Sequence, residues 1–159
     1  MSETGGVVVV GVDGTAHGDA ALAFAADEAR RCGDSLQVVT AWQYEVRAPA
    51  PNVMPMPLDT HAYAEQEQAA ALARAGDLSD LVVAREMVEG EAGPALVEVA
   101  RGARLLVVGS RSVGPVRAAL LGSVSRYCAQ HAPCPVVVVP GAPAEGEVGA
   151  LAFDVSEGR

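Results

Sequence analysis

The segment spanning residues 109–125 carries the residue types best suited to binding an anion. An apolar run ending before Gly109 predicts a buried strand, and small residues such as Ser112 follow it. A helix is predicted to begin at Gly122 and Ser123. Backbone N–H groups in such a loop can point at an anion, and the helix dipole adds about half a positive charge. The segment therefore predicts a nucleotide or phosphate site, with a tight strand-to-helix connection lacking any ligand as the alternative.

The two common phosphate-binding fingerprints are both missing from the sequence. The P-loop places a lysine directly after its last glycine, whereas here Ser123 follows Gly122. The dinucleotide-binding fingerprint G-x-G-x-x-G follows a first strand, but the first apolar run of this chain leads into Gly11-Val-Asp-Gly14.

Three charged residues near these loops each have two interpretations. Asp13 can cap the first helix from a turn, or it can contact a ligand, and the two roles are compatible. Because a carboxylate repels phosphate, the ligand group would be a ribose, a base or a Mg²⁺ ion. Arg111 and Arg117 can neutralise phosphates, or they can be solvated surface residues.

Neither metal chemistry nor strong catalysis is indicated. The three histidines, His17, His61 and His131, lack the spacing of metal ligands, and no Gly-x-Ser-x-Gly nucleophile elbow is present. The three cysteines, Cys32, Cys128 and Cys134, form no Cys-x-x-Cys pair, and we expect them to be small buried hydrophobic residues. With an N-terminus unlike an export signal, this cysteine usage favours the cytoplasm.

Length and charge restrict the class of protein further. A chain of 159 residues with 50% hydrophobic residues predicts one domain, which we place at residues 1–141, followed by an acidic, flexible tail at 142–159. A net charge of −9 argues against nonspecific nucleic-acid binding. The apolar run after Gly6 is too short to span a membrane, so no membrane partner is expected.

Apolar runs alternate with helical patterns along the chain, which predicts an α/β fold. The runs cover residues 7–12, 36–41, 81–88, 105–108 and 135–139. Most are continuously apolar, as in strands covered by helices on both faces. We therefore predict a single-domain, doubly wound, Rossmann-like parallel sheet of five strands in the order 3-2-1-4-5. Run 81–88 contains charged residues, so it is the best candidate for an edge strand.

Helices are predicted between the strands. The first buries Leu22, Ala25, Ala26 and Ala29 and ends at Gly33, and the second covers residues 62–75. The third starts near Pro94, a good first helical residue, and buries Leu96, Val99 and Ala100, and the fourth has Ser123 as its N-cap. Residues 43–59 contain four prolines and predict an irregular excursion. In this topology the loops after the first and fourth strands face one crevice, where ligands bind in such sheets.

At these two loops the chain resembles the universal stress protein family. The motifs that carry the resemblance are Val9-Val-Gly-Val-Asp-Gly-Thr15, Leu36-Gln-Val-Val-Thr-Ala-Trp42, Glu89-Gly-Glu-Ala-Gly-Pro-Ala95, Arg101-Gly-Ala-Arg-Leu-Leu-Val-Val-Gly-Ser-Arg111, Leu120-Leu-Gly-Ser-Val-Ser125 and His131-Ala-Pro-Cys-Pro-Val-Val-Val-Val139. They cover residues 5–140. ATP-binding members of the family carry G-x2-G-x9-G-S/T. Gly109, Gly122 and Ser123 match this motif, and Ser112 replaces its second glycine.

The resemblance implies a fold like that of adenine nucleotide alpha hydrolases and a site for ATP, with or without Mg²⁺, or for another adenine nucleotide. It places Asp13 and Ala41 at the adenosine end with Val108 nearby, and it places Gly109, Ser112, Gly122, Ser123 and Val124 around the phosphates. We include Gly11 and Arg111 among the predicted nucleotide-binding residues. It also implies a homodimer formed by pairing of the last strand, from Pro135 to Val139, with its counterpart in a second copy. A valine-rich edge strand left without a partner would be an aggregation hazard, which is consistent with such pairing.

We therefore expect a cytoplasmic stress-response sensor or regulator that binds an adenine nucleotide and hydrolyses it slowly at most. The alternative is an interaction protein of the same fold whose nucleotide site is degenerate, an interpretation that Ser112 favours. A slow nucleotide hydrolase is a third interpretation.

Overall fold

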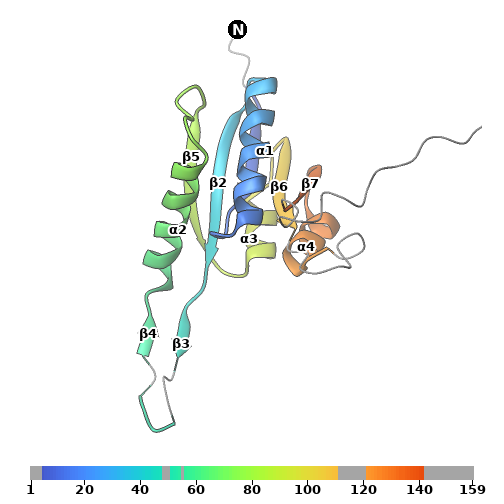
Figure 1. Ribbon diagram of the computed structural model, residues 1–159. Helices are drawn as coiled ribbons and strands as arrows, with labels where there is room; N and C mark the ends of the chain where they lie inside the picture. The colour runs from blue at the N-terminus through green and yellow to red at the C-terminus, as the bar shows by residue number, and fades with distance from the viewer. Residues whose placement is uncertain (1–4, 48–50, 55, 111–120, 142–159) are drawn as a thin grey trace, which may run out of the picture.

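The computed structural model describes residues 5–47, 51–54, 56–110 and 121–141, and helices and strands alternate through them (Figure 1). In chain order the elements are β1 (Val7–Gly11), α1 (Ala16–Cys32), β2 (Ser35–Trp42), β3 (Glu45–Arg47), β4 (Met56–Leu58), α2 (Thr60–Arg74), β5 (Val83–Glu89), α3 (Ala92–Val99), β6 (Leu105–Ser110), α4 (Ser123–His131) and β7 (Val136–Pro140). Among the helices that the structure describes, none is long and apolar enough to cross a membrane.

Five of the strands form one parallel sheet in the order β5-β2-β1-β6-β7. This is the predicted order 3-2-1-4-5, so the doubly wound fold is confirmed, and β5 lies at an edge as its charged residues suggested. In the centre, Val9 of β1 pairs with Gln37 of β2 on one side and with Leu106 of β6 on the other. The chain first winds outward from β1 through β2 to β5, and then crosses to β6 and β7. The order therefore reverses between β1 and β6.

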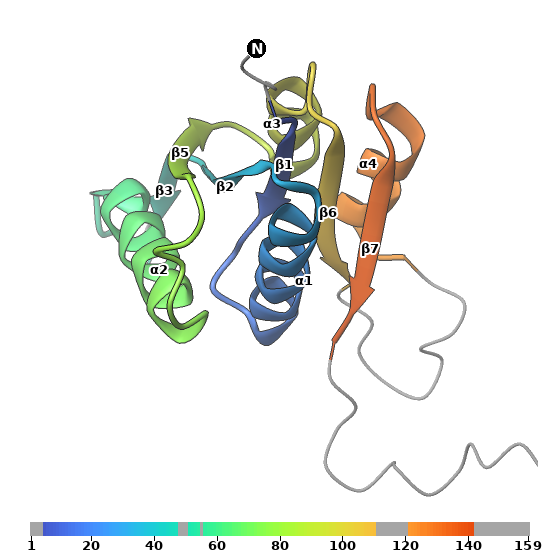
Figure 2. The ribbon, with the colours of Figure 1, turned by 90° about the horizontal axis from the view of Figure 1, so that it is seen from above.

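Helices cover both faces of the sheet, α1 and α2 one face and α3 and α4 the other (Figure 2). Successive side chains of a strand point to opposite faces, so Val8 and Val10 pack in the cluster with α1, and Val9 packs in the cluster with α3 and α4. All three valines are fully buried. The apolar run of β1 thus fills two cores at once, which is why it reads as continuous rather than alternating.

The first helix ends where its sequence predicts and buries the predicted face. Leu22, Ala25 and Ala29 are fully buried, and Gly33 ends the helix with φ +70°, a conformation that favours glycine. Its N-cap is Thr15, whose side chain accepts a hydrogen bond from the Gly18 N–H.

The starts of the other three helices differ from the predictions by one or two residues. α2 begins at Thr60 because Asp59 caps it, accepting from the Ala62 N–H at 3.0 Å. α3 begins at Ala92, which makes Pro94 its third residue rather than its first. α4 has Gly122 as its N-cap, with extended backbone angles, and Ser123 is already helical. Glycine and serine are both acceptable N-caps, and the prediction chose the serine, one position too late.

The prediction for residues 43–59 was wrong in part, because they include an antiparallel hairpin. β3 pairs with β4, Glu45 opposite Leu58, in a small sheet separate from the main one. The hairpin extends from the end of β2 and the start of α2, away from the rest of the domain (Figure 1). Strands of three residues with Pro57 in one of them give no readable period, which explains the miss.

Candidate nucleotide site

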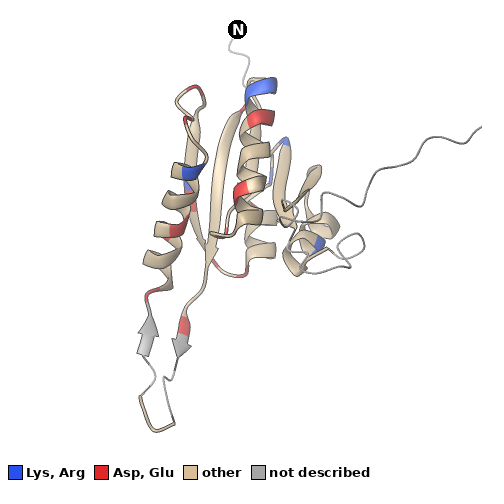
Figure 3. Cartoon of the chain, viewed as in Figure 1, with Lys and Arg blue, Asp and Glu red and all other residues tan. Residues whose placement is uncertain are grey.

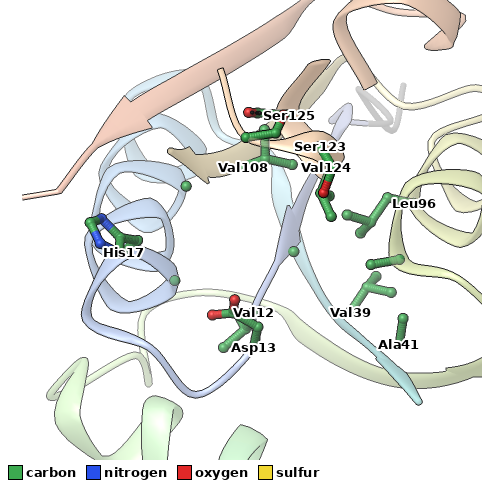
Figure 4. A pocket seen from close by; sticks show the side chains of 15 residues that line it. Val12, Asp13, His17, Val39, Ala41, Leu96, Val108, Ser123, Val124 and Ser125 are labelled. Carbon is green, nitrogen blue, oxygen red and sulfur yellow. Dashed lines mark hydrogen bonds between the residues drawn. The ribbon is translucent and has the colours of Figure 1, made fainter. Parts of the chain in front are cut away.

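A cavity of about 150 Å³ opens at the carboxyl ends of β1 and β6, where the strand order reverses. It is lined by Gly11, Val12, Asp13, His17, Gly18, Val39, Ala41, Ala92, Leu96, Val108, Gly109, Gly122, Ser123, Val124 and Ser125. Figure 4 shows these residues arranged around the space, from β1 and the start of α1 on one side to α3 and the start of α4 on the other. The loop after β1, the end of β6 and the start of α4 therefore meet at one crevice, while residues 111–120 of the second predicted loop lie outside the described residues.

Most of the residues predicted for the site come together at this cavity. Gly11, Asp13, Ala41, Val108, Gly109, Gly122, Ser123 and Val124 line it. The two others, Arg111 and Ser112, lie outside the residues that the structure describes, as does Arg117.

Two strand-end glycines allow neighbouring elements to approach the cavity closely. A Cβ atom on Gly109 would lie 2.5 Å from the backbone carbonyl oxygen of His17, so β6 and the first turn of α1 touch there. A Cβ atom on Gly11 would lie 2.7 Å from Cδ1 of Leu96, which is 4% exposed on α3. The two glycines therefore allow α1 and α3 to pack closely against the strand ends beside the cavity.

Asp13 follows β1 and is fixed by the turn into α1. Its Oδ1 accepts hydrogen bonds from the backbone N–H of Thr15 at 3.1 Å and from the Thr15 hydroxyl at 2.6 Å. The predicted capping role thus passes to Thr15, and Asp13 orients that cap. Gly18 makes room for the carboxylate, since a Cβ atom there would lie 2.8 Å from the same Oδ1.

The start of α4 forms the opposite wall. Its N-cap, Gly122, has no side chain to cap the helix, and the Ser125 hydroxyl donates to the Gly122 carbonyl at 3.1 Å. The first N–H groups of a helix have no acceptor within the helix, and they form the positive end of its dipole. Ser123 and Val124 present this end to the cavity. The wall is therefore suited to an anionic group.

Sequence reasoning missed several of the lining residues, namely Val12, His17, Gly18, Val39, Ala92, Leu96 and Ser125. Leu96 was assigned to the core, and it both packs there and reaches the cavity. His17 was considered only as a metal ligand. Its Nδ1 is buried and, among the described residues, has no hydrogen-bond partner. The predicted topology indicated their helices, since α1 and α3 start at the same edge of the sheet as the cavity, but it did not indicate which of their side chains reach the cavity.

The thiols take no part in this cavity. Cys128 is fully buried in the cluster with Leu106 and Ala100, whereas Cys32 and Cys134 are half-buried. Burial, with a smaller contribution from Cys134, raises the pKa of the Cys128 thiol to about 11. Cys128 is thus the small buried hydrophobic residue that was predicted. In the described part of the chain, no group of three or more histidine, cysteine or acidic residues is arranged to hold a metal ion.

A doubly wound parallel sheet with a glycine-bordered cavity at its switch point defines a class of α/β proteins that bind ligands at this edge. Within that class, residues 6–140 match the model of the universal stress protein family, and the chain belongs to this family.

Its curated relatives are universal stress proteins of two lengths. Universal stress protein Rv2005c of Mycobacterium tuberculosis is 34% identical over 138 residues, which cover 83% of this chain and 47% of the relative. The chain thus spans about half the length of that relative. A universal stress protein of Thermus aquaticus is 32% identical over 137 residues, which cover 83% of this chain and 96% of the relative.

Solved structures give the same fold. A universal stress protein crystallised in complex with cAMP aligns with a TM-score of 0.61 and 27% identity, covering 88% of this chain and all of the other. The universal stress protein of Archaeoglobus fulgidus in complex with dAMP aligns with a TM-score of 0.56 and 22% identity, covering 86% and 98% of the two chains. At that identity the second structure is similar in fold alone.

Proposed function

We propose that this protein binds an adenine nucleotide, ATP or a related one, in the cavity between β1, β6 and α4, and acts as a stress-response sensor or regulator. The observation that carries the proposal is the cavity itself, because it brings the start of α4 together with the carboxyl ends of β1 and β6. The cAMP complex of a relative 27% identical to this chain supports an adenine nucleotide as the ligand.

In this proposal the ligand lies across the strand ends. Asp13, Ala41 and Val108 contact the adenosine, and a Mg²⁺ ion that accompanies ATP would lie near the Asp13 carboxylate. Gly109, Gly122, Ser123 and Val124 surround the phosphates, where backbone N–H groups of α4 and the Ser123 hydroxyl donate to them. Arg111 and Ser112 extend this set from the segment outside the described residues. The protein is a binding module, and any hydrolysis is slow and incidental.

Calorimetric titration of the full chain with ATP, ADP, AMP and cyclic AMP tests the proposal. Trp42 supplies a second signal: it is the one tryptophan of the sequence, and it lines a neighbouring hollow that shares Ser123 and Val124 with the cavity. We expect binding of at least one ligand and its loss in Gly122→Val, which places a branched side chain at the start of α4. Ala129→Val, at an exposed position of the same helix, is the matched control. Absence of binding by folded wild-type protein would reject the proposal.

A degenerate site is the alternative function, and Ser112 is the residue that favours it. In that case the protein acts through a macromolecular partner instead of a nucleotide. Ser112→Gly separates the two: a degenerate site gains nucleotide affinity when the glycine is restored, whereas a working site changes little. Phosphate release from ATP that disappears in Gly122→Val would instead revive the hydrolase interpretation.

We also propose a cytoplasmic homodimer formed through β7. This strand is at the edge of the sheet, and its four valines are half-buried. Antiparallel pairing with a second β7 would satisfy the outer backbone groups and join two sheets. We expect sedimentation as a dimer at micromolar concentration, and monomeric or insoluble protein for Val137→Pro, which removes a ladder donor. A monomeric wild-type chain would contradict the proposal.

A further inference from the structure

An aromatic surface lies at the base of the hairpin, where β2 ends and α2 begins (Figure 1). It comprises Trp42, Tyr44 and Tyr63, which are the one tryptophan and two of the three tyrosines of the chain. The Trp42 ring packs edge-on with Tyr44 and with His61, at centroid distances of 5.1 and 4.9 Å. Tyr44 and Tyr63 are 68% and 65% exposed. Because tyrosine and tryptophan are the residues that most often anchor protein interfaces, this aromatic surface is suited to docking a partner.

A hollow of about 320 Å³ adjoins the aromatic surface, between the end of β2 and the first two turns of α2. Trp42 and Tyr63 line it together with three carboxylates, those of Asp13, Glu45 and Glu67. The Asp13 carboxylate is held in the turn into α1, so Glu45 and Glu67 are the acidic groups that can meet a partner. In its described lining the hollow thus combines aromatic rings with negative charge.

The ion pairs of the described residues use other carboxylates. They involve Asp19, Asp27, Glu28, Asp34, Asp80 and Glu98. Arg74 lies on the same helix as Glu67, and its guanidinium is bound to Asp19 at 2.7 Å. A partner that carries cations would meet complementary charge at Glu45 and Glu67, and it would meet aromatic rings, whose faces attract cations.

We propose that the aromatic surface and its hollow dock a basic segment of another protein. Arginine or lysine side chains of that segment contact Tyr63 and the carboxylates of Glu45 and Glu67. This interaction does not depend on nucleotide binding, so the two proposals stand or fall separately.

The test uses the full chain without nucleotide and a labelled synthetic peptide of alternating arginine and alanine. We expect saturable binding, measured by the anisotropy of the label and by the fluorescence of Trp42, the one tryptophan. The affinity should fall as ionic strength rises from about 0.05 M to about 0.3 M, because salt screens complementary charges. The same peptide with glutamate in place of arginine should not bind. Absence of binding by the arginine peptide, or binding that leaves Trp42 fluorescence unchanged, overturns the proposal.

Charge variants test where the peptide binds. The double substitution Glu45→Gln, Glu67→Gln removes two negative charges from the hollow, and should weaken peptide binding at least about fivefold. The control, Asp27→Asn with Glu98→Gln, removes two negative charges from side chains that are 82% and 70% exposed on α1 and α3. It should weaken binding about twofold at most, since salt screens distant charges. Equal losses would mean that the peptide responds to the net charge of the chain, and would overturn the proposal.

An aromatic variant tests the surface without changing charge. Tyr63→Ser should weaken peptide binding about threefold, because it removes a ring that attracts cations. Phe24→Ser is the control, at an exposed aromatic residue of α1, and should leave the affinity unchanged. Equal affinities of Tyr63→Ser and wild type would contradict the proposal. Self-association of the wild-type chain that Tyr63→Ser abolishes would show that a second copy occupies the surface, and would overturn the proposal as well.

Discussion

The two ends of the central sheet are built on different principles. At the amino end, charged residues follow one another along the last turns of α1 (Figure 3). Arg30 pairs with Asp80 at 2.7 Å, Arg31 with Glu28 at 2.5 Å, and Arg104 with the buried carboxylate of Asp34. At the carboxyl end, most of the described residues that line the cavity are glycine, alanine, valine and serine, and the others are Leu96, His17 and one carboxylate, Asp13.

This difference separates stability from binding. Ion pairs and the capping of α1 by Gly33 hold the elements together at the amino end. The carboxyl end keeps an open cavity and the positive start of α4 available. We therefore expect substitutions at the amino end to change the free energy of unfolding alone, and substitutions at the carboxyl end to change nucleotide binding. The glycines at the strand ends are an exception, because replacing them also disturbs the packing of the helices.

The largest effect on stability is expected from a strand-end glycine, in the variant Gly109→Ala. The added methyl group meets the His17 carbonyl oxygen at 2.5 Å, and neither backbone can yield by rotating a side chain. We expect the free energy of unfolding, measured by urea denaturation, to fall by about 3 kcal/mol. Gly11→Ala is the matched control, because its methyl group meets the movable Leu96 side chain at 2.7 Å, and its cost should be about 1 kcal/mol. Equal costs for the two variants would contradict this explanation.

The sequence was a good guide to this fold where one residue type has one physical role. Continuous apolar runs such as residues 7–12 require burial on both faces, and Gly33 ends a helix with a positive φ, so strand order and the first helix could be predicted. The hairpin of β3 and β4 could not, because three-residue strands have no period of their own.

For the site, motif residues such as Asp13 and Gly122 could be assigned in advance, since they lie at strand and helix ends. Leu96 and His17 could not be distinguished from core or surface residues, because each enters the cavity through the packing of its helix. Likewise, Gly122 and Ser123 are both acceptable N-caps, and the backbone angles decide between them.

A smaller effect is expected at the amino end from Asp34→Ala. This residue is 7% exposed, and its carboxylate accepts from the Gly6 N–H at 2.7 Å and from Arg104. Its removal leaves the N–H group without that acceptor, and should lower the free energy of unfolding by about 2 kcal/mol in urea denaturation. Asp34→Asn keeps an oxygen for Gly6 and should cost less. Nucleotide affinity should be unchanged in both variants, and a change would show that the two ends are coupled.

The smallest effect is expected from Asp80→Asn, and it should depend on pH. Hydrogen bonding to the Arg30 guanidinium holds the pKa of the Asp80 carboxyl below its ordinary value of 3.8. A lowered pKa in the folded state means that the ionised carboxyl contributes stability above its unfolded pKa. That contribution is lost as the pH falls through the folded pKa.

Wild type should therefore be slightly more stable than Asp80→Asn at pH 7. The difference in urea midpoint should shrink below about pH 4 and vanish once the carboxyl is protonated in both states. Because the pair is exposed, added salt at pH 7 should reduce the same difference. A difference that persists or grows in acid would mean that Asp80 acts through its shape or its neighbours, and that the amino end is not held by charge.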